Sequence, residues 1–150
     1  LRPLSGRLRG LRLSACSAKG AIMVGVDLTG AQMQGANLEG ADLRGACFAD
    51  ADLRGIRLSQ ANLIKADLRD AVFAPLPISA DRTTPGYLAH AKIRYAHAEG
   101  CDLTGAVLDG ADLRGADFTG AYLDDASFKD AQLAAVVGLE ETRPRRIKFV

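Results

Sequence analysis

The chain has 150 residues, a net charge of +1, 48% hydrophobic residues and no tryptophan. This length is typical of a single domain with a real hydrophobic core. The sequence contains no run of 18 apolar residues and no signal-peptide pattern, so we expect neither a transmembrane helix nor export.

Residues 1–20 carry five basic residues and no acidic one. Leu8 and Leu13 are five residues apart, a spacing that becomes regular from residue 21 onwards. We expect residues 1–20 to form a degenerate coil that caps the N-terminal end of a repetitive structure, because such an end exposes its core.

A five-residue pattern runs from residue 21 to 73 and again from 91 to 135. Every fifth residue is large and apolar, a small residue stands two positions before it, and Gly commonly follows two positions after it. On a helix this pattern would drift by about 140° per repeat. On a flat strand consecutive repeats would face opposite sides, because five is odd. The chain must therefore turn a corner once per repeat, as in a solenoid whose small and large residues point inward.

The pattern is interrupted at residues 74–90, which hold three of the five prolines. Asp81 falls where a small inward residue is required, and burying an unpaired carboxylate costs several kcal/mol. Ile93 nevertheless follows Phe73 by twenty residues, so the repeat register continues unshifted. A coil bulged near 81–85 and a full loop both remain open. We favour a distorted coil with a protruding loop, in which three apolar residues still point inward: Leu76, Ile78 and Leu88.

The chain ends in an apolar group followed by a basic tail. Val136, Val137 and Leu139 come directly after the last repeat, and four basic residues stand between 143 and 148. We expect residues 136–150 to form the C-terminal cap and tail. The apolar group also favours a homodimer through one solenoid end.

The repeats resemble the consensus A-(D/N)-L-x-x of the pentapeptide-repeat family. The match is carried by "ADLRG" at 41, 51 and 111 and "ANLEG" at 36, and it covers residues 21–135 apart from the interruption. The resemblance implies an all-β fold, a right-handed quadrilateral β-helix with four repeats per coil. Large residues twenty apart would then stack, with Leu28 beneath Phe48 and Leu68, and Leu108 beneath Phe128.

The sequence offers no catalytic motif, so we expect no enzyme activity and no cofactor. His97 and Cys101 have a spacing seen in metal sites, but His97 should point outward and Cys101 inward, which argues against a metal site. The repeated Asp residues should accept hydrogen bonds from nearby backbone amides. Three scattered cysteines fit a reducing compartment, and we expect a bacterial cytoplasmic protein.

Function is best interpreted as a non-catalytic scaffold for protein–protein interaction. Residues 95–142 carry ten acidic and two basic residues, which marks this part of the chain for an unknown protein partner. The candidate contact residues are Arg82 in the interruption and six carboxylates: Asp102, Asp109, Asp112, Asp117, Asp124 and Asp125.

Two alternatives stay open. One branch of the family binds DNA gyrase by imitating DNA and confers quinolone resistance, and an acidic segment suits that role. The basic start and the expected stacking of Asp109 on Lys129 and of Asp112 on Lys92 count against it. The other alternative is a regulatory module attached to a cyclic-dinucleotide-binding PilZ domain, in which case the chain is a fragment. Direct binding to nucleic acid is not expected, because no aromatic residues are interleaved with the basic ones.

Overall fold

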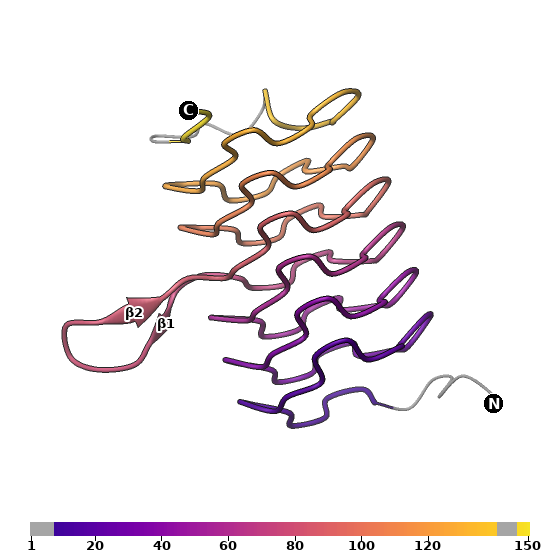
Figure 1. Cartoon of the computed structure of the whole chain (residues 1–150), viewed down its shortest axis with the longest axis vertical. Helices are drawn as coiled ribbons and strands as arrows, with labels where there is room; N and C mark the ends of the chain where they lie inside the picture. Colours follow the sequence, from indigo (N-terminus) through magenta and orange to yellow (C-terminus); the bar gives the residue numbers. More distant parts are fainter. Residues whose placement is uncertain (1–7, 141–146) are drawn as a thin grey trace.

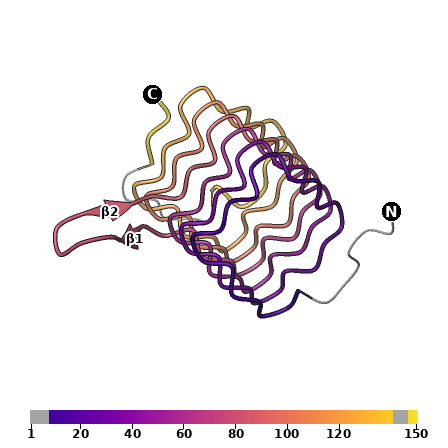
Figure 2. The ribbon, with the colours of Figure 1, turned by 60° about the horizontal axis from the view of Figure 1, so that its bottom comes forward.

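The structure, a computed structural model, describes residues 8–140 and 147–150. Residues 1–7 of the predicted N-terminal cap and residues 141–146 of the basic tail lie outside the described part. The described chain winds into a quadrilateral β-helix (Figures 1 and 2). In the regular coils parallel bridges link residues twenty apart, with one bridge on each of the four sides. Residues 8–140 and 147–150 contain no helix, so none that could cross a membrane.

Each repeat forms one of the four sides of a coil. Asp42 shows the pattern: its N–H donates to the carbonyl of Ala21 in the coil below at 2.9 Å, and its own carbonyl accepts from Met23 at 2.8 Å. Ala41 and Leu43, on either side of Asp42, are fully buried. The alternation of one outward residue between two inward ones therefore follows from the strand geometry of a single bridge.

The core is a continuous apolar column from Val26 to Phe128, and it contains no buried polar residue in the described part of the chain. Bridges join Asp27, Cys47 and Asp67 in turn, so Leu28, Phe48 and Leu68 stack as predicted. The stacking of Leu108 beneath Phe128 is also confirmed.

The corners require a left-handed backbone. The second corner residue has a φ between +56° and +71° throughout the regular repeats, and Gly fills most of these positions because it has no Cβ. At other corners another residue adopts this φ, and in some of these cases its side chain lies over the glycine of the next coil. His90 covers Gly110 and Tyr95 covers Gly115 in this way, which leaves no room for a Cβ at either glycine.

A hairpin projects from the solenoid in the middle of the chain (Figure 1). Strand β1 (Leu76–Pro77) pairs antiparallel with β2 (Thr83–Thr84). Below this point the bridges join residues twenty apart, but Arg57 pairs with Tyr87 and Val72 with Asp102, thirty residues later. The hairpin is therefore a ten-residue insertion at one corner of an otherwise regular coil.

This insertion corrects the prediction of an unshifted register. Ile93 stacks on Leu63, not on Phe73, because Leu63 donates its N–H to the carbonyl of Lys92. Because ten residues equal two repeats, the large residues before and after the insertion keep the same five-residue spacing. The insertion therefore cannot be recognised from the spacing alone. The protruding loop is confirmed, but the distorted coil around it is wrong.

Two of the three apolar residues predicted to point inward do not. Ile78 is 54% exposed and Leu76 half-buried beside Gly55, whereas Leu88 is buried in the core. The prolines explain why: a corner needs a positive φ and a backbone N–H, and proline supplies neither. A segment with three prolines cannot complete two sides of a coil, so it leaves the solenoid.

The C-terminal end is covered by the last described residues. Lys148 forms a parallel bridge with Ser127, and the ring of Phe149 stacks on Phe128 with centroids 6.0 Å apart. Val136 and Leu139 pack against the core, whereas Val137 is exposed. The predicted cap is thus formed in part by residues 136–139 and in part by residues 147–150.

Candidate interaction surfaces

The outward residues line up on four sides of the solenoid, because the bridges stack them. Side I holds Arg12, Gln32, Asp52, Val72, Asp102 and Tyr122; side II holds Ser17, Asn37, Arg57, Tyr87, Val107 and Ser127. Side III holds Ile22, Asp42, Asn62, Lys92, Asp112 and Gln132; side IV holds Asp27, Cys47, Asp67, His97, Asp117 and Val137. Each side also carries the two corner residues that follow it in the chain.

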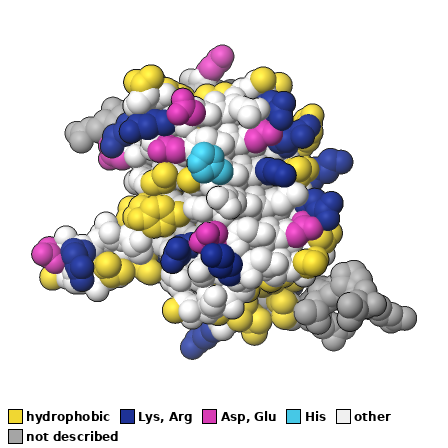
Figure 3. Space-filling view, viewed as in Figure 1, with side chains coloured by type: hydrophobic (Ala, Val, Ile, Leu, Met, Phe, Trp, Pro, Cys, Tyr) yellow, Lys and Arg dark blue, Asp and Glu magenta, His cyan; other side chains and the backbone are white. Residues whose placement is uncertain are grey.

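The six candidate carboxylates do not form one surface. Asp102 lies on side I, and Asp124 and Asp125 occupy the corner that follows it in the next coil. Asp109, Asp112 and Asp117 belong to sides II, III and IV. Figure 3 shows one face, on which acidic and basic side chains are interspersed. The candidate carboxylates are therefore distributed around the solenoid axis, and only side I with its corner holds three of them.

The outward carboxylates bond to the corner amides, as predicted. Asp102 accepts from the N–H of Thr104 at 2.9 Å, and Asp117 accepts from both the N–H and the hydroxyl of Thr119. The hydrogen bond from the Thr119 hydroxyl lowers the pKa of Asp117. These carboxylates hold the corner in place as well as facing solvent.

Several carboxylates also pair with an arginine two residues later. Arg114 donates to both oxygens of Asp112, at 2.8 and 2.7 Å, and these bonds hold the pKa of Asp112 below its ordinary range. Arg94 approaches the same carboxylate at 3.9 Å. The same bidentate geometry recurs at the pairs 42–44, 52–54 and 67–69.

The two predicted stacked pairs, Asp109 with Lys129 and Asp112 with Lys92, are confirmed, but the carboxylates bond to groups other than the lysine side chains. Asp112 does lie one coil above Lys92, yet its ion-pair partners are arginines. Asp109 lies beneath Lys129 and accepts from its backbone N–H at 3.1 Å and from the hydroxyl of Ser127.

Acidic and basic residues are concentrated on different sides of the solenoid, a feature that the sequence alone does not predict. Side IV with its corner carries seven acidic and two basic residues within the described part of the chain: Asp27, Asp50, Asp67, Asp70, Glu99, Asp117 and Glu140 against Arg9 and Arg69. Side III with its corner carries five basic and two acidic residues: Arg44, Lys65, Lys92, Arg94 and Arg114 against Asp42 and Asp112. Like charges recur every twenty residues along a side, but the spacing is thirty residues across the hairpin. The charge pattern can therefore be recognised only when the insertion is known.

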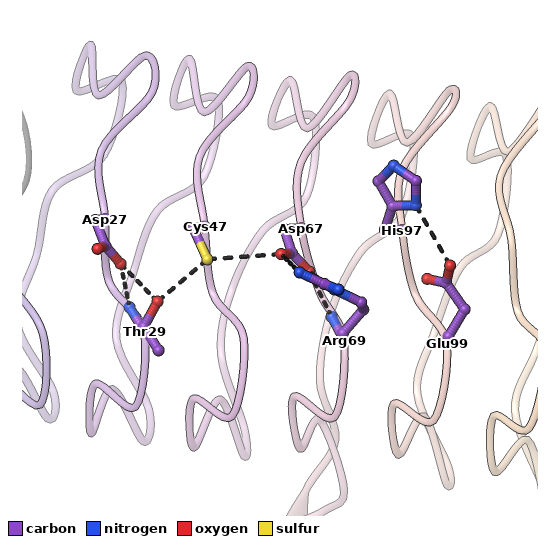
Figure 4. A network of polar contacts seen from close by, with 7 residues as sticks. All are labelled: Asp27, Thr29, Cys47, Asp67, Arg69, His97 and Glu99. Carbon is purple, nitrogen blue, oxygen red and sulfur yellow. Dashed lines mark hydrogen bonds and ion pairs between the residues drawn. The ribbon is translucent and has the colours of Figure 1, made fainter.

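Side IV also contains a chain of polar contacts (Figure 4). The thiol of Cys47 lies 3.2 Å from the hydroxyl of Thr29 and 3.8 Å from Oδ2 of Asp67. His97 contacts Glu99 at 3.3 Å and points away from the core, whereas Cys101 is buried and its burial raises the pKa of its thiol. His97 and Cys101 therefore do not converge on a common ligand. No group of three or more potential metal ligands occurs in the part of the chain that the structure describes.

The hairpin carries the remaining candidate, Arg82. Its carbonyl accepts from the N–H of Ile78 at 2.9 Å, which closes the tip of the hairpin. Where the hairpin joins the solenoid, a groove of about 410 Å³ is lined by Arg57, Ser59, Thr84 and Tyr87. The hairpin base groove, as we call it, is a concave feature on a solenoid with otherwise repetitive sides.

The repeats match the family model for pentapeptide repeats in eight copies, over residues 7–45, 46–74, 87–120 and 101–136. The chain belongs to the pentapeptide-repeat family. The matched segments omit residues 75–86, where the hairpin is inserted. Membership confirms the right-handed quadrilateral β-helix that the resemblance implied.

Solved structures agree with this fold. Two structures of trypsin-treated QnrB1, a plasmid-mediated fluoroquinolone resistance protein, align with TM-scores of 0.57 and 0.51 at 16% and 17% identity. They cover 93% of this chain, and the chain covers 62% and 64% of theirs, so it spans less than two thirds of their length.

Two further pentapeptide-repeat proteins are similar in sequence. One, from the thylakoid lumen of Arabidopsis thaliana, is 30% identical over 83% of this chain and 68% of its own, with a TM-score of 0.30. The other, Rfr23 from the cyanobacterium Cyanothece, is 24% identical over 87% and 89%, with a TM-score of 0.33. No curated protein sequence matches the chain.

Proposed function

We propose that this pentapeptide-repeat scaffold is non-catalytic and binds a partner protein, with the hairpin as the principal contact. The observation that carries the proposal is the ten-residue insertion itself. A regular solenoid would need only one corner residue between Ala74 and Gly86, yet the chain places a paired hairpin there. Its three prolines restrict the backbone before any partner arrives, which reduces the entropy lost on binding.

The hairpin has the composition of a contact surface. Ile78 is 54% exposed at its tip, beside the exposed Asp81 and Arg82. A large apolar side chain flanked by charged groups, and held away from the solenoid, can enter a pocket on a partner while the charges fix its orientation.

The acidic side IV and the carboxylates of side I lie on the same rigid body and supply further polar contacts. Exposed charges of this kind change the association rate and its salt dependence more than the affinity. We therefore propose that the hairpin provides most of the binding free energy and that the acidic sides raise the association rate and orient the partner.

A cross-linking experiment tests this assignment. A photo-reactive amino acid replaces Ile78 in one variant and Ile22, which is 82% exposed on side III, in the matched control. We expect a discrete cross-linked protein from position 78 in the source cells and none from position 22. Cross-links from position 22 alone would contradict the proposal.

A second function is favoured by the structural likeness to QnrB1, a fluoroquinolone resistance protein. In this proposal the chain imitates DNA and binds gyrase. A phosphate-like surface needs continuous negative charge, however, and here the candidate carboxylates are divided among four sides and partly neutralised by arginines.

A supercoiling assay with and without a quinolone separates the two functions. We expect no inhibition and no drug protection at micromolar protein. Inhibition that disappears when Asp117, Asp124 and Asp125 become Asn would establish the gyrase function instead.

Three further expectations remain proposals. A bacterial cytoplasmic location is one of them, and the three free cysteines support a reducing compartment. The exposed Val137 supports a homodimer through the C-terminal end, and a light-scattering mass of one chain at high micromolar concentration would exclude it. Attachment to a PilZ domain would be tested by the sequence of the full-length gene product.

A further inference from the structure

The hairpin base groove gathers polar side chains from segments far apart in the sequence. Tyr87 lies directly above Arg57 on side II, because the two residues form a parallel bridge and Leu58 donates its N–H to the carbonyl of Tyr87 at 2.7 Å. Ser59 follows at the next corner, and Thr84 reaches the groove from strand β2. The inserted hairpin therefore converts a flat side of the solenoid into a concave site.

The groove contains one charge and three hydroxyl groups. Arg57 is the charged lining residue, and its Nη2 has a single ion-pair contact, at 3.4 Å to Oε2 of Glu39. Glu39 also contacts Lys19 at 3.5 Å, so it is shared between two cations. The side-chain hydroxyls of Ser59, Thr84 and Tyr87 form no hydrogen bond within residues 8–140 and 147–150. Three hydroxyl groups without a partner in this part of the chain and one guanidinium with a single, shared ion-pair partner thus line the same groove.

We propose that the hairpin base groove binds a carboxylate carried on an aromatic or aliphatic group. The guanidinium of Arg57 offers a planar pair of donors, which matches the two oxygens of a carboxylate. The hydroxyls complete the coordination, and the half-exposed ring of Tyr87 provides an apolar wall for the body of the ligand. A volume of about 410 Å³ lies within the range of small-molecule sites.

A carboxylate fits this groove better than a phosphate. The lining provides one positive charge, and the neighbouring Glu39 carboxylate would repel a second negative charge on the ligand. The carboxylate has two sources that share this chemistry: a free organic acid and the C-terminus of a polypeptide. The inference holds whether or not the hairpin tip binds a partner protein.

Titration of the isotope-labelled protein by two-dimensional NMR tests the site. The probes are phenylacetate, the neutral phenylacetamide, inorganic phosphate, and a short peptide ending in Phe as the free acid and as the amide. We expect phenylacetate at millimolar concentration to shift, saturably, the amides of residues 57–59 and 83–88. We expect no such shift with phenylacetamide or with phosphate.

Variants locate the binding group. Arg57→Gln should weaken phenylacetate binding about tenfold or more, since a bidentate charge-assisted pair is lost. Arg114→Gln, which removes an exposed arginine on another side, should leave binding unchanged, and the spectra of both variants report whether they are folded. Peptide binding that exceeds phenylacetate and is lost on amidation assigns the site to polypeptide C-termini. A peptide that binds no better assigns it to free acids.

Three results would overturn the inference. They are the absence of saturable shifts with both phenylacetate and the free-acid peptide, equal binding of phenylacetamide or phosphate, and unchanged binding in a folded Arg57→Gln variant.

Discussion

Excision of the hairpin tests whether the insertion is separate from the solenoid. We consider a variant in which residues 75–85 are replaced by one glycine, so that the sequence becomes "AVFAG" followed by "GYLAH". The new glycine occupies the corner that Gly35, Gly55 and Gly105 occupy in other coils, with φ of +65° to +67°. We expect an uninterrupted β-helix in which the four bridges that now join residues thirty apart join residues twenty apart.

The effect on stability should be small because two contributions oppose each other. Shortening the connection between Phe73 and Gly86 from twelve residues to two stabilises the fold by about 1.5 kcal/mol, because a shorter loop loses less conformational entropy on closure. Removing the half-buried Leu76 from its contact with Gly55 loses about 1 kcal/mol of apolar burial. The free energy of unfolding in urea should therefore change by less than about 1 kcal/mol, with an unchanged circular dichroism spectrum.

A simple deletion of residues 75–84 is the matched control, since it leaves Pro85 at the same corner. Proline cannot adopt a positive φ and cannot donate to Thr104 in the coil above, so we expect this variant to be about 3 kcal/mol less stable than the glycine variant. Equal stability of the two shortened proteins would refute the account of the corner. A loss of more than about 3 kcal/mol in the glycine variant would show that the hairpin is integral to the solenoid.

Three further predictions follow from the same geometry. Trypsin should cut first after Arg82 in the exposed hairpin, and earlier cleavage after Arg114, which is paired with a carboxylate, would show that the hairpin is better protected than the coils. Gly40→Ala should lower the free energy of unfolding in urea by about 1 kcal/mol, because alanine at this corner must adopt a positive φ. Gly110→Ala should lower it further, because the added Cβ also meets the ring of His90. Equal losses in the two variants would contradict the contact between His90 and Gly110. The pKa of Asp112 lies below its ordinary value of 3.8, so the stability from this group is present above that pH and is lost as the pH falls through the folded pKa. In Arg114→Gln, NMR titration should find the Asp112 carboxyl protonated at a higher pH than in the unsubstituted protein, and an unchanged titration would show that the ion pair contributes nothing.

The repeats could be predicted from the sequence because each one specifies its own geometry. Within each repeat the small and the large residue point inward, the residue between them points outward, and the glycine forms the corner. None of these positions depends on contacts with residues far away in the sequence. The stacking of Leu28, Phe48 and Leu68 followed directly from that local rule and the family resemblance. The same rule placed His97 outward and Cys101 inward.

The hairpin and the sorting of charge could not be predicted in the same way. The insertion preserves the five-residue phase, so Ile93 looked like the successor of Phe73 and proved to stack on Leu63. Which outward residues share a side depends on the number of repeats between them. A constant spacing of twenty therefore gives the wrong lower neighbour to the residues of the first coil after the hairpin, from Tyr87 to Asp102, and the wrong side relative to the coils below the hairpin. The hairpin base groove was invisible for the same reason, since it depends on Tyr87 lying above Arg57.

The most direct test of the proposed function compares partner binding with and without the hairpin. The partner identified by cross-linking from position 78 is titrated calorimetrically into the unaltered protein, the glycine excision variant and Asp117→Asn. We predict that excision weakens binding more than tenfold although the solenoid remains folded, whereas Asp117→Asn, which changes one exposed carboxylate on side IV, weakens it less than about threefold. Equal affinity of the excision variant and the unaltered protein would contradict the claim that the hairpin is the principal contact.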